Sequence, residues 1–334
     1  MVSVFRMLAE EVRRYLALLG ARSLEEVVGR ADLLVPVDHP LAASLAELLV
    51  RFDSRSRHPG YRPFAVSKLS RRLAAEAEEA IEGEVPIRLS YPVSNTDRTV
   101  GARLSGLVTA RYGAEGLPEG SVSVMLSGTA GQSFGAWLAP GISLRLDGVA
   151  NDYVGKGMGG GRIVVVPRRN ADDPEVSPQA GGNAVMYGAT GGLLLMSGAV
   201  GQRFAVRNSG GTAVVEGCSD HGCEYMTGGR TLILGPVGAN FAAGMTGGVS
   251  YVWDPEFRLH GYLADTSPAV RRPTGQDAEE IRRLVSLHLQ HTQSPFAERI
   301  LSAWSREAPR FWVLEAARRV PLTPILPLTA STAH

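Results

Sequence analysis

The chain has 334 residues, of which 44% are hydrophobic and 20% charged, and its formal net charge at pH 7 is +1. A near-neutral chain without a dense basic cluster lacks the electrostatic footprint of nucleic-acid or anionic-membrane binding. No run of 18 apolar residues occurs, so we expect no membrane span and a cytoplasmic location. The only cysteines, Cys218 and Cys223, are too few for a disulfide framework.

The N-terminal part of the chain is predicted to be helical. Residues 4–20 carry apolar side chains at helical spacing, namely Phe5, Leu8, Val12, Leu16 and Leu19. Ser23 and Glu26 form a capping-box pattern, which predicts a second short helix directly after the first. A third helix is predicted over 67–83, and the alternation over 86–106 predicts strands that lead into the next region.

Residues 151–167, NDYVGKGMGGGRIVVVP, place Gly155, Gly157 and Gly160 at the spacing of a dinucleotide-binding loop. Such a loop must open a helix, whose free N–H groups bind the pyrophosphate. Here the glycines precede a β-branched run ended by proline, which indicates a strand. Lys156 also lacks the preceding spacer and the following Ser or Thr of a P-loop, so we predict no nucleotide site.

Glycine is concentrated in the middle of the chain, where 28 of the 39 glycines lie between positions 128 and 248. Gly-Gly pairs precede short apolar runs there and begin at Gly191, Gly210, Gly228 and Gly247. The steps between the pairs are 19, 18 and 19 residues, and a longer step before Gly191 contains a polar insertion over 168–182. These regular steps indicate an internal structural repeat.

A period of about 19 residues without helical periodicity predicts one turn of a parallel β-helix. In that fold the strands of successive turns lie about 4.8 Å apart, and equivalent side chains repeat in register. Glycine suits stacked corners because it has no Cβ and adopts positive φ at little cost. We therefore assign Gly155, Gly157, Gly159 and the first glycine of each pair to corners of a right-handed, single-stranded parallel β-helix over about 104–253.

The expected fold class is mainly β, with flanking α-helices at both termini. After the repeats, Thr274 with Asp277 and Ser294 with Pro295 predict two helix starts, the second helix carrying Trp304. Such helices would cover the strand edges that a stack of coils leaves open.

Three regions are expected along the chain. An N-terminal helical segment with lead-in strands occupies 1–100, the glycine-rich β-helix occupies 101–254, and a loop, helices and an unassigned tail occupy 255–334.

The segment CSDHGCE gathers five potential metal ligands, namely Cys218, Asp220, His221, Cys223 and Glu224. Zinc usually takes four ligands, and the Cys-x2-His-x-Cys group supplies at most three. We favour a turn in which Asp220 and His221 satisfy backbone groups, and a metal site is the alternative.

Two long segments, 104–165 and 216–254, closely resemble the C-terminal β-helix domain, with its GXGXG motif, of the glutamate synthase large subunit. The resemblance extends to 9–34 and 291–313, and leaves the tail of the chain unassigned. In that enzyme an N-terminal cysteine hydrolyses glutamine. A flavin barrel with an iron–sulfur cluster reduces the imine formed from 2-oxoglutarate and ammonia.

The resemblance implies a non-catalytic scaffold in glutamate biosynthesis. The sequence begins Met-Val-Ser and has two cysteines, so we expect no nucleophile, no cofactor and no metal in this chain. FMN and an iron–sulfur cluster are expected in a partner subunit, and a glutaminase-type amidotransferase chain is the other expected partner. Self-association into a homo-oligomer is left open.

Two alternatives remain open. Similar glycine-rich domains occur in formylmethanofuran dehydrogenase and in multi-chain enzymes that make N-methylglutamate, so the chain is alternatively a subunit of such a complex. The segment 10–34 favours glutamate synthase over these. The other alternative is a stand-alone metal-binding enzyme that uses the residues between Asp220 and Glu224.

Overall fold

The computed structural model describes residues 2–35, 37, 49, 67–169 and 177–316. The chain divides into two compact units, Met1–Ala65 and Val66–His334. Sequence analysis placed its boundaries at residues 100 and 254 instead, and that three-part division stays a prediction. The tail after residue 316 and residues 170–176 of the insertion over 168–182 lie outside the described residues.

The first unit contains the helix α1 (Val2–Leu18), as predicted, and two 3₁₀ turns, η1 (Leu24–Glu26) and η2 (Ala31–Leu33). The apolar stripe of α1 is largely exposed within the described residues, and Phe5 keeps 67% of its accessible surface. The second short helix predicted after Ser23 is present only as the 3₁₀ turn η1, and the capping box is not formed. The Ser23 side chain makes no cap hydrogen bond, and Glu26 instead accepts from the backbone N–H of Arg22.

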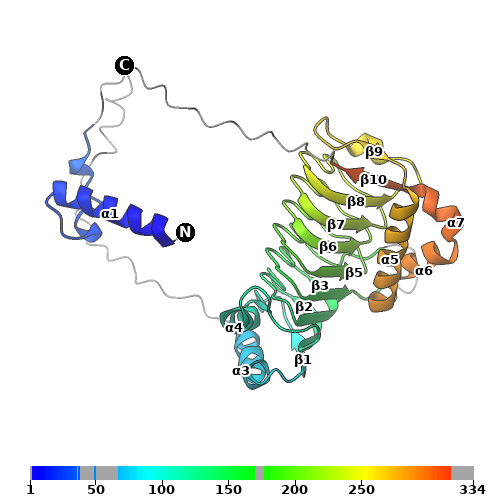
Figure 1. The fold of residues 1–334 in the computed structure, drawn as a ribbon, viewed down its shortest axis with the longest axis horizontal. Coiled ribbons are helices and arrows are strands. Elements are labelled where there is room, and N and C mark those ends of the chain that lie inside the picture. Colours follow the sequence, from blue (N-terminus) through cyan, green and yellow to red (C-terminus); the bar gives the residue numbers. More distant parts are fainter. Residues whose placement is uncertain (1, 36, 38–48, 50–66, 170–176, 317–334) are drawn as a thin grey trace, which may run out of the picture. The chain divides into compact units, whose positions relative to one another are not determined.

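The second unit is built on a ladder of eight parallel strands that follow one another along the chain (Figure 1). The strands are β1 (Ile87–Val93), β2 (Val122–Ala130), β3 (Ile142–Ala150), β4 (Arg162–Val166), β5 (Leu193–Met196), β6 (Ser209–Val215), β7 (Thr227–Ile233) and β8 (Gly247–Trp253). Each strand pairs in parallel with the next. The predicted mainly-β parallel β-helix with flanking helices is therefore confirmed.

The ladder begins earlier than position 104, where the sequence placed its start. β1 pairs along its whole length with β2, and the helix α4 (Ala102–Tyr112) lies between them in the chain. In α4 the buried residues Leu104, Ser105 and Val108 have helical spacing, so the continued strand alternation expected there was wrong.

The two ends of the ladder are covered differently. Beside β1, α4 packs against the predicted helix α3 (Lys68–Glu82), as Figure 1 shows. At the other end β10 (Phe311–Glu315) pairs antiparallel with β8. On its other side β10 pairs antiparallel with the short β9 (Val270–Arg271), which is the last strand of the sheet. A strand from the C-terminal region thus covers the last edge, where sequence analysis expected helices.

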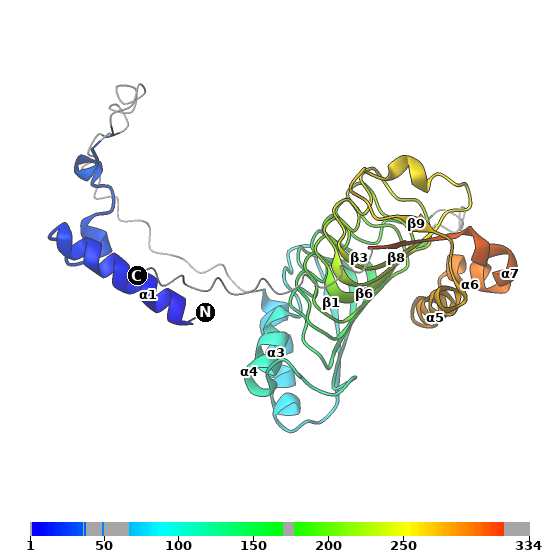
Figure 2. The same ribbon diagram turned by 45° about the horizontal axis from the view of Figure 1, so that its top comes forward.

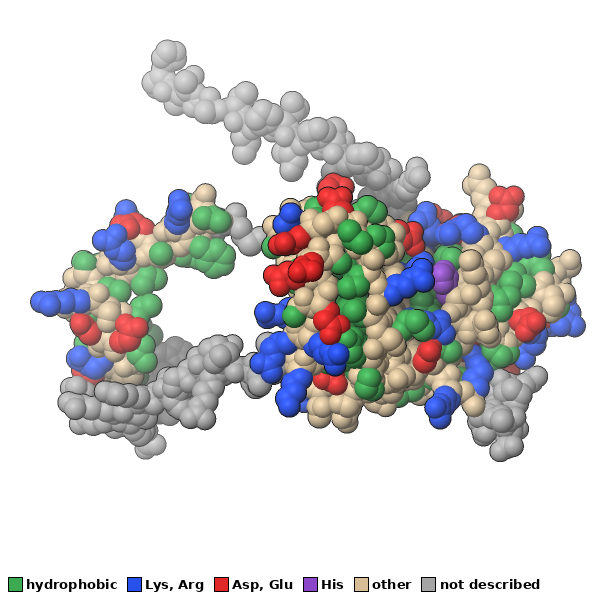
Figure 3. All heavy atoms as spheres, turned by 90° about the horizontal axis from the view of Figure 1, so that it is seen from below, with side chains coloured by type: hydrophobic (Ala, Val, Ile, Leu, Met, Phe, Trp, Pro, Cys, Tyr) green, Lys and Arg blue, Asp and Glu red, His purple; other side chains and the backbone are tan. Residues whose placement is uncertain are grey.

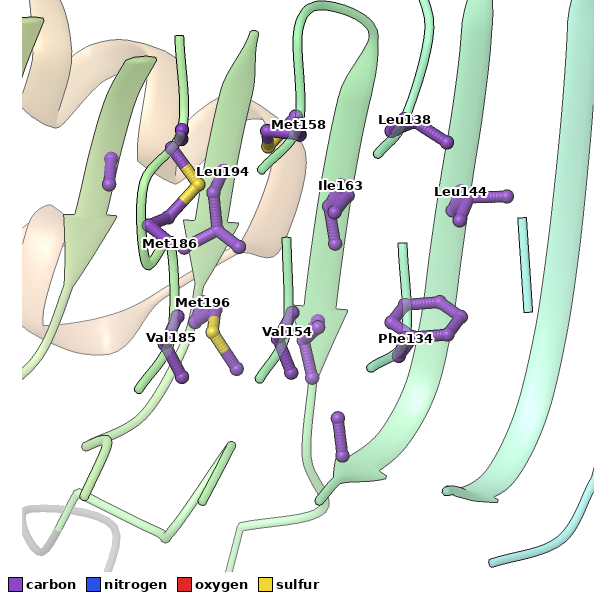
Figure 4. Close-up of a cluster of buried hydrophobic side chains, with 14 of the residues drawn as sticks. Phe134, Leu138, Leu144, Val154, Met158, Ile163, Val185, Met186, Leu194 and Met196 are labelled. Carbon is purple, nitrogen blue, oxygen red and sulfur yellow. The ribbon is translucent and has the colours of Figure 1, made fainter. Parts of the chain in front are cut away.

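The interior is filled by columns of apolar side chains from successive turns (Figure 4). Leu144, Ile163 and Leu194 occupy equivalent register positions on β3, β4 and β5. Phe134 and Val154 form part of a neighbouring column, and both are fully buried. Successive turns therefore bury their inner apolar faces against one another, which is the packing expected of a solenoid.

The outer face of strands β4 to β8 is also buried, because helices pack on it (Figure 2). These helices are α5 (Gly275–Thr292), α6 (Pro295–Ser302) and α7 (Trp304–Glu307), with the 3₁₀ turns η4 (Leu259–Tyr262) and η5 (Ala308–Arg310) nearby in the chain. Both predicted starts, at Thr274 and Ser294, are confirmed. Trp304 belongs to α7, because α6 ends at Ser302. Burial on two faces explains the continuous apolar runs of these strands.

Candidate functional site

The stretch 151–167 contains a corner of the β-helix at 153–157 and then leads into β4, as predicted. Tyr153, Gly155 and Gly157 are left-handed, with φ of 64°, 65° and 61°. The Tyr153 and Gly157 N–H groups donate to carbonyls of the following turn, whereas the Gly155 N–H donates to Phe134 in the preceding turn. The N–H groups of the three left-handed residues thus point in turn to the following turn, the preceding turn and the following turn again.

The same arrangement recurs in every turn and forms three columns, which we call the αL corner. The first column is Ser133, Tyr153, Ala184, Arg203, His221 and Asn240; the second is Gly135, Gly155, Met186, Ala205, Cys223 and Ala242; the third is Trp137, Gly157, Gly188, Arg207, Tyr225 and Gly244. Every member has φ between 53° and 66°. Most are not glycine, so the backbone hydrogen bonds between turns hold a conformation that L-residues rarely adopt.

The Gly-Gly pairs form a different corner, just before the strands. A Cβ at Gly210 would collide with the carbonyl oxygen of Thr190 in the preceding turn, and Gly228 and Gly247 meet the same restriction. The second glycine of a pair is left-handed at position 192, where φ is 85°. Gly159 belongs to the same corner, because a Cβ at Gly191 would collide with the Gly159 carbonyl oxygen. The glycines assigned to one set of corners therefore lie at two corners with different geometry.

The side chains of the CSDHGCE segment are dispersed, because neighbouring residues of a corner point to opposite sides. Asp220 Oδ1 accepts from the Ala239 N–H at 2.8 Å, which links two turns. His221 Nδ1 lies 2.8 Å from Glu224 Oε1, on a partly exposed surface. Cys223 is fully buried inside the β-helix. The structure thus pairs His221 with Glu224 and separates both from Cys223.

Neither cysteine has the environment of a reactive thiol. Burial raises the pKa of Cys223 to about 11, against weaker lowering contacts with Thr231 and Ser250. Burial also raises the pKa of Cys218 well above its ordinary value. The thiolate is the form that attacks electrophiles and binds metals, so both thiols are poor nucleophiles at neutral pH. In residues 2–35, 67–169 and 177–316, no three His, Cys, Asp or Glu side chains are grouped to hold a metal ion.

A buried polar cluster around Glu216 was missed by the sequence analysis. Glu216 follows β6 and is 1% exposed. Arg169 Nη2 donates to its carboxylate at 2.6 and 2.7 Å, and Ser294 Oγ donates at 2.5 Å. His288 Nε2 lies 3.5 Å from Glu216 Oε1, and Ser177 Oγ donates to the carboxylate at 2.9 Å. The cluster joins the β-helix to α5, which carries His288, and to α6, which Ser294 caps.

The Glu216 carboxylate is charged despite its burial. Burial alone would raise its pKa, but the contacts with His288, Ser294 and Arg169 together lower the pKa to about 2. His288 is fully buried and faces this carboxylate from α5. The signal available in the sequence was a lone glutamate directly after an apolar strand. Two of its partners, Arg169 and Ser294, are 47 and 78 residues away in the sequence, which is too far for any local motif to reveal them.

A cavity of about 270 Å³ lies near the end of β8, with Trp253, Leu259 and Phe296 in its lining. The carboxylate of Asp254 in its wall accepts hydrogen bonds from the backbone N–H groups of Arg258 and Leu259. This acid therefore fixes the loop before η4. On the surface shown in Figure 3, acidic and basic side chains are interspersed, as expected for a net charge of +1.

Comparison with known proteins places this architecture in a family. The family model described as the GXGXG motif matches residues 70–317. The chain belongs to the GXGXG family. This GXGXG chain is 46% identical over 320 residues to the glutamate synthase [NADPH] large chain of Azospirillum brasilense, 44% over 326 residues to the glutamate synthase [NADH] of Schizosaccharomyces pombe, and 42% over 323 residues to the ferredoxin-dependent glutamate synthase 2 of Synechocystis sp..

Each of these matches covers 93% of the GXGXG chain, which spans only 21%, 15% and 21% of the respective relatives. The resemblance to glutamate synthase stated from the sequence is confirmed, and the similarity concerns one part of a much longer enzyme. None of the helices in the described ranges is at once long enough and apolar enough for a membrane span.

Proposed function

We propose that this chain is the non-catalytic β-helix scaffold of a glutamate synthase whose catalytic parts are separate polypeptides. The observation that carries the proposal is the 46% identity to a glutamate synthase large chain across 93% of the chain. That region is 21% of the relative, which leaves most of the enzyme's length for its catalytic parts. The scaffold would hold a glutaminase-type chain and a synthase chain with FMN and an iron–sulfur cluster.

The chemistry of the chain's own side chains supports a structural role. An iron–sulfur cluster takes four protein ligands, usually cysteines, and the two cysteines here are buried with raised pKa values. They do not fit such a cluster, so we assign it to a partner. Asp220 and Glu216, two acids in polar surroundings, are each committed to hydrogen bonds that tie parts of the fold together.

The architecture supports the same role. Every turn is hydrogen-bonded to its neighbours both through the strands and through the αL corner. A stack tied at several places around each turn is a stiff body with long sides. Durable interfaces between subunits usually bury more than about 2,000 Å², and a long rigid side offers such an area without an ordering cost.

Affinity purification of the tagged chain from its own cells tests the proposal. We expect a glutaminase-type chain and a flavin–iron–sulfur chain to co-purify, and the assembly to form glutamate from glutamine and 2-oxoglutarate. Recovery of homo-oligomers alone, or of partners unrelated to glutamine metabolism, would refute it. Partners carrying a molybdenum or tungsten cofactor would instead favour a related complex of the formylmethanofuran dehydrogenase type.

The chain purified alone provides the matching control. We expect no flavin absorbance and no bound iron, and neither glutamine hydrolysis nor 2-oxoglutarate reduction. Metal analysis addresses the alternative of a stand-alone metal enzyme. One equivalent of zinc per chain, lost on Cys223→Ser, would show that alternative to be right.

A further inference from the structure

The αL corner presents a row of large side chains, which we call the αL ridge; all of them are exposed except Lys156, which is half-buried. The ridge consists of Trp137, Tyr153, Lys156, Arg203, Arg207 and Tyr225. Its three aromatic side chains are among the most exposed of the β-helix, with Trp137 at 55% and Tyr225 at 54%. Single exposed apolar residues are ordinary, whereas several large ones gathered along one corner are typical of interaction surfaces.

The ridge residues come from four turns of one stack, and the turn at 184–188 between them contributes no ridge side chain. The Trp137 N–H donates to the carbonyl of Lys156 in the next turn, and the Arg203 and Arg207 N–H groups donate to the turn that contains Tyr225. Lys156 Nζ lies 5.9 Å from the Trp137 ring centre and 5.2 Å from that of Tyr153. The two ends of the ridge therefore belong to one rigid ladder of backbone hydrogen bonds.

The fold does not require large side chains at these positions. Trp137, Arg207 and Tyr225 occupy a column in which the other three turns have glycine. Glycine adopts this left-handed backbone without strain, whereas a residue with a Cβ adopts it at a cost. The hydrogen bonds between turns enforce this conformation in every column, so the backbone strain is structural, but it does not explain why exposed positions carry Trp, Arg and Tyr in place of glycine.

The aromatic anchors are already held in place. A Cβ built on Gly157 would lie 3.0 Å from atoms of the Trp137 indole, and one built on Gly244 would lie 2.7 Å from the Tyr225 ring. Each ring therefore rests on the glycine of the following turn. Side chains fixed before binding lose little conformational entropy when a partner covers them.

The charges of the ridge are unbalanced. Within the described residues, Arg203 and Arg207 form no ion pair, and Lys156 contacts only aromatic rings through its ammonium group. Three acids lie in the same corners, and each is engaged elsewhere: Glu224 with His221, Asp220 with the Ala239 N–H, and Asp152 with the Asn183 N–H. Aromatic and arginine side chains are the residues that most often dominate binding energy at protein interfaces.

We propose that the αL ridge binds an acidic face of a catalytic chain in the same complex. The inference rests on the proposed scaffold function and adds the surface and the charge of its partner. The unpaired cations would meet carboxylates, and the Trp137 and Tyr225 rings would insert into apolar recesses between them.

Substitution by glycine tests the ridge without endangering the fold, because glycine suits the left-handed backbone. Trp137→Gly with Tyr225→Gly removes the anchors, and Arg203→Glu with Arg207→Glu reverses the charge. Phe257→Gly is the matched control, since Phe257 is left-handed with φ of 59° and 58% exposed but lies after β8, outside the three columns. Melting temperature reports whether each variant folds, and the binding of each full-length variant is measured against the purified glutaminase-type chain and the purified flavin–iron–sulfur chain.

We expect each double substitution to weaken binding to one of the two chains by about tenfold or more, with the charge reversal losing its effect at high salt. Phe257→Gly should bind within about twofold of the unsubstituted chain. If the unsubstituted chain binds and both ridge variants bind equally well, the ridge proposal is wrong and the scaffold function stands. If the unsubstituted chain binds neither catalytic chain, the proposed scaffold function is wrong, and so is the proposal that the ridge binds a catalytic chain. Ridge-dependent self-association would assign the surface to a second copy and overturn the proposal.

Discussion

The Ser294 hydroxyl donates a 2.5 Å hydrogen bond to Glu216 Oε1, across 78 residues of sequence. The same hydroxyl accepts from the N–H of Ala297 and so caps α6. One side chain thus fixes both the start of a helix and its attachment to the β-helix. The carboxylate is the centre of this attachment, because Arg169 and His288 approach it as well.

Removal of the buried charge should destabilise the unit strongly. We expect Glu216→Gln to lower the free energy of unfolding by about 3 kcal/mol, since the Arg169 cation would remain without its counter-ion. Glu119→Gln is the matched control, because Glu119 pairs with Arg162 but its side chain is 80% exposed. This substitution should change the free energy of unfolding by less than about 0.5 kcal/mol. Urea unfolding followed by circular dichroism measures both. Equal effects would show that the cluster contributes nothing specific.

The Glu216 cluster also predicts how stability depends on pH. The pKa of Glu216 is lowered from an ordinary 4.5 to about 2 in the folded protein, so the unfolded chain takes up the proton first. Its contribution should be complete above pH 4.5, decline as pH falls, and be lost near pH 2. Unfolding curves at a series of pH values measure the slope. Glu216→Gln should flatten it, and an unchanged slope would assign acid lability to other groups such as Asp277, whose pKa is also about 2.

The close stacking of the Gly-Gly corners predicts that adding one methyl group there lowers the stability of the fold. Gly210→Ala places a Cβ against the carbonyl oxygen of Thr190, and the strain should cost more than ~2 kcal/mol. Gly275→Ala is a suitable control, since a Cβ there meets no atom within 4 Å. It should alter stability by less than about 0.5 kcal/mol. Thermal unfolding compares the two, and similar melting temperatures would contradict the close approach of successive turns.

Both thiols should be inert in the folded protein. Burial raises the pKa of Cys223 to about 11 and that of Cys218 also, so an aromatic disulfide reagent at pH 8 should label neither until urea is added. Ser302→Cys supplies an exposed thiol on α6 and should react at once. Rapid labelling of the unsubstituted chain would show that the β-helix opens around these residues.

Features set by neighbouring residues could be predicted from the sequence. The caps at Thr274 and Ser294 depend on groups within one helical turn, and the strand at 162–166 shows in its β-branched residues. The period of the Gly-Gly pairs is readable because each first glycine must admit the carbonyl of the turn before it. These constraints act at every turn, so they leave a repeated mark in the sequence.

Other features were decided only by contacts between distant segments. Met186, Ala205 and Cys223 share the left-handed conformation of Gly155, but no residue type marks it, because hydrogen bonds from adjacent turns impose it. Glu216 meets Arg169 only once the turns have stacked, and it meets His288 and Ser294 only once the helices have packed on the outer sheet face. Local propensity determines where an element begins and which face is apolar. Which buried charges meet, and which backbone conformations are enforced, depends on how the turns and helices stack.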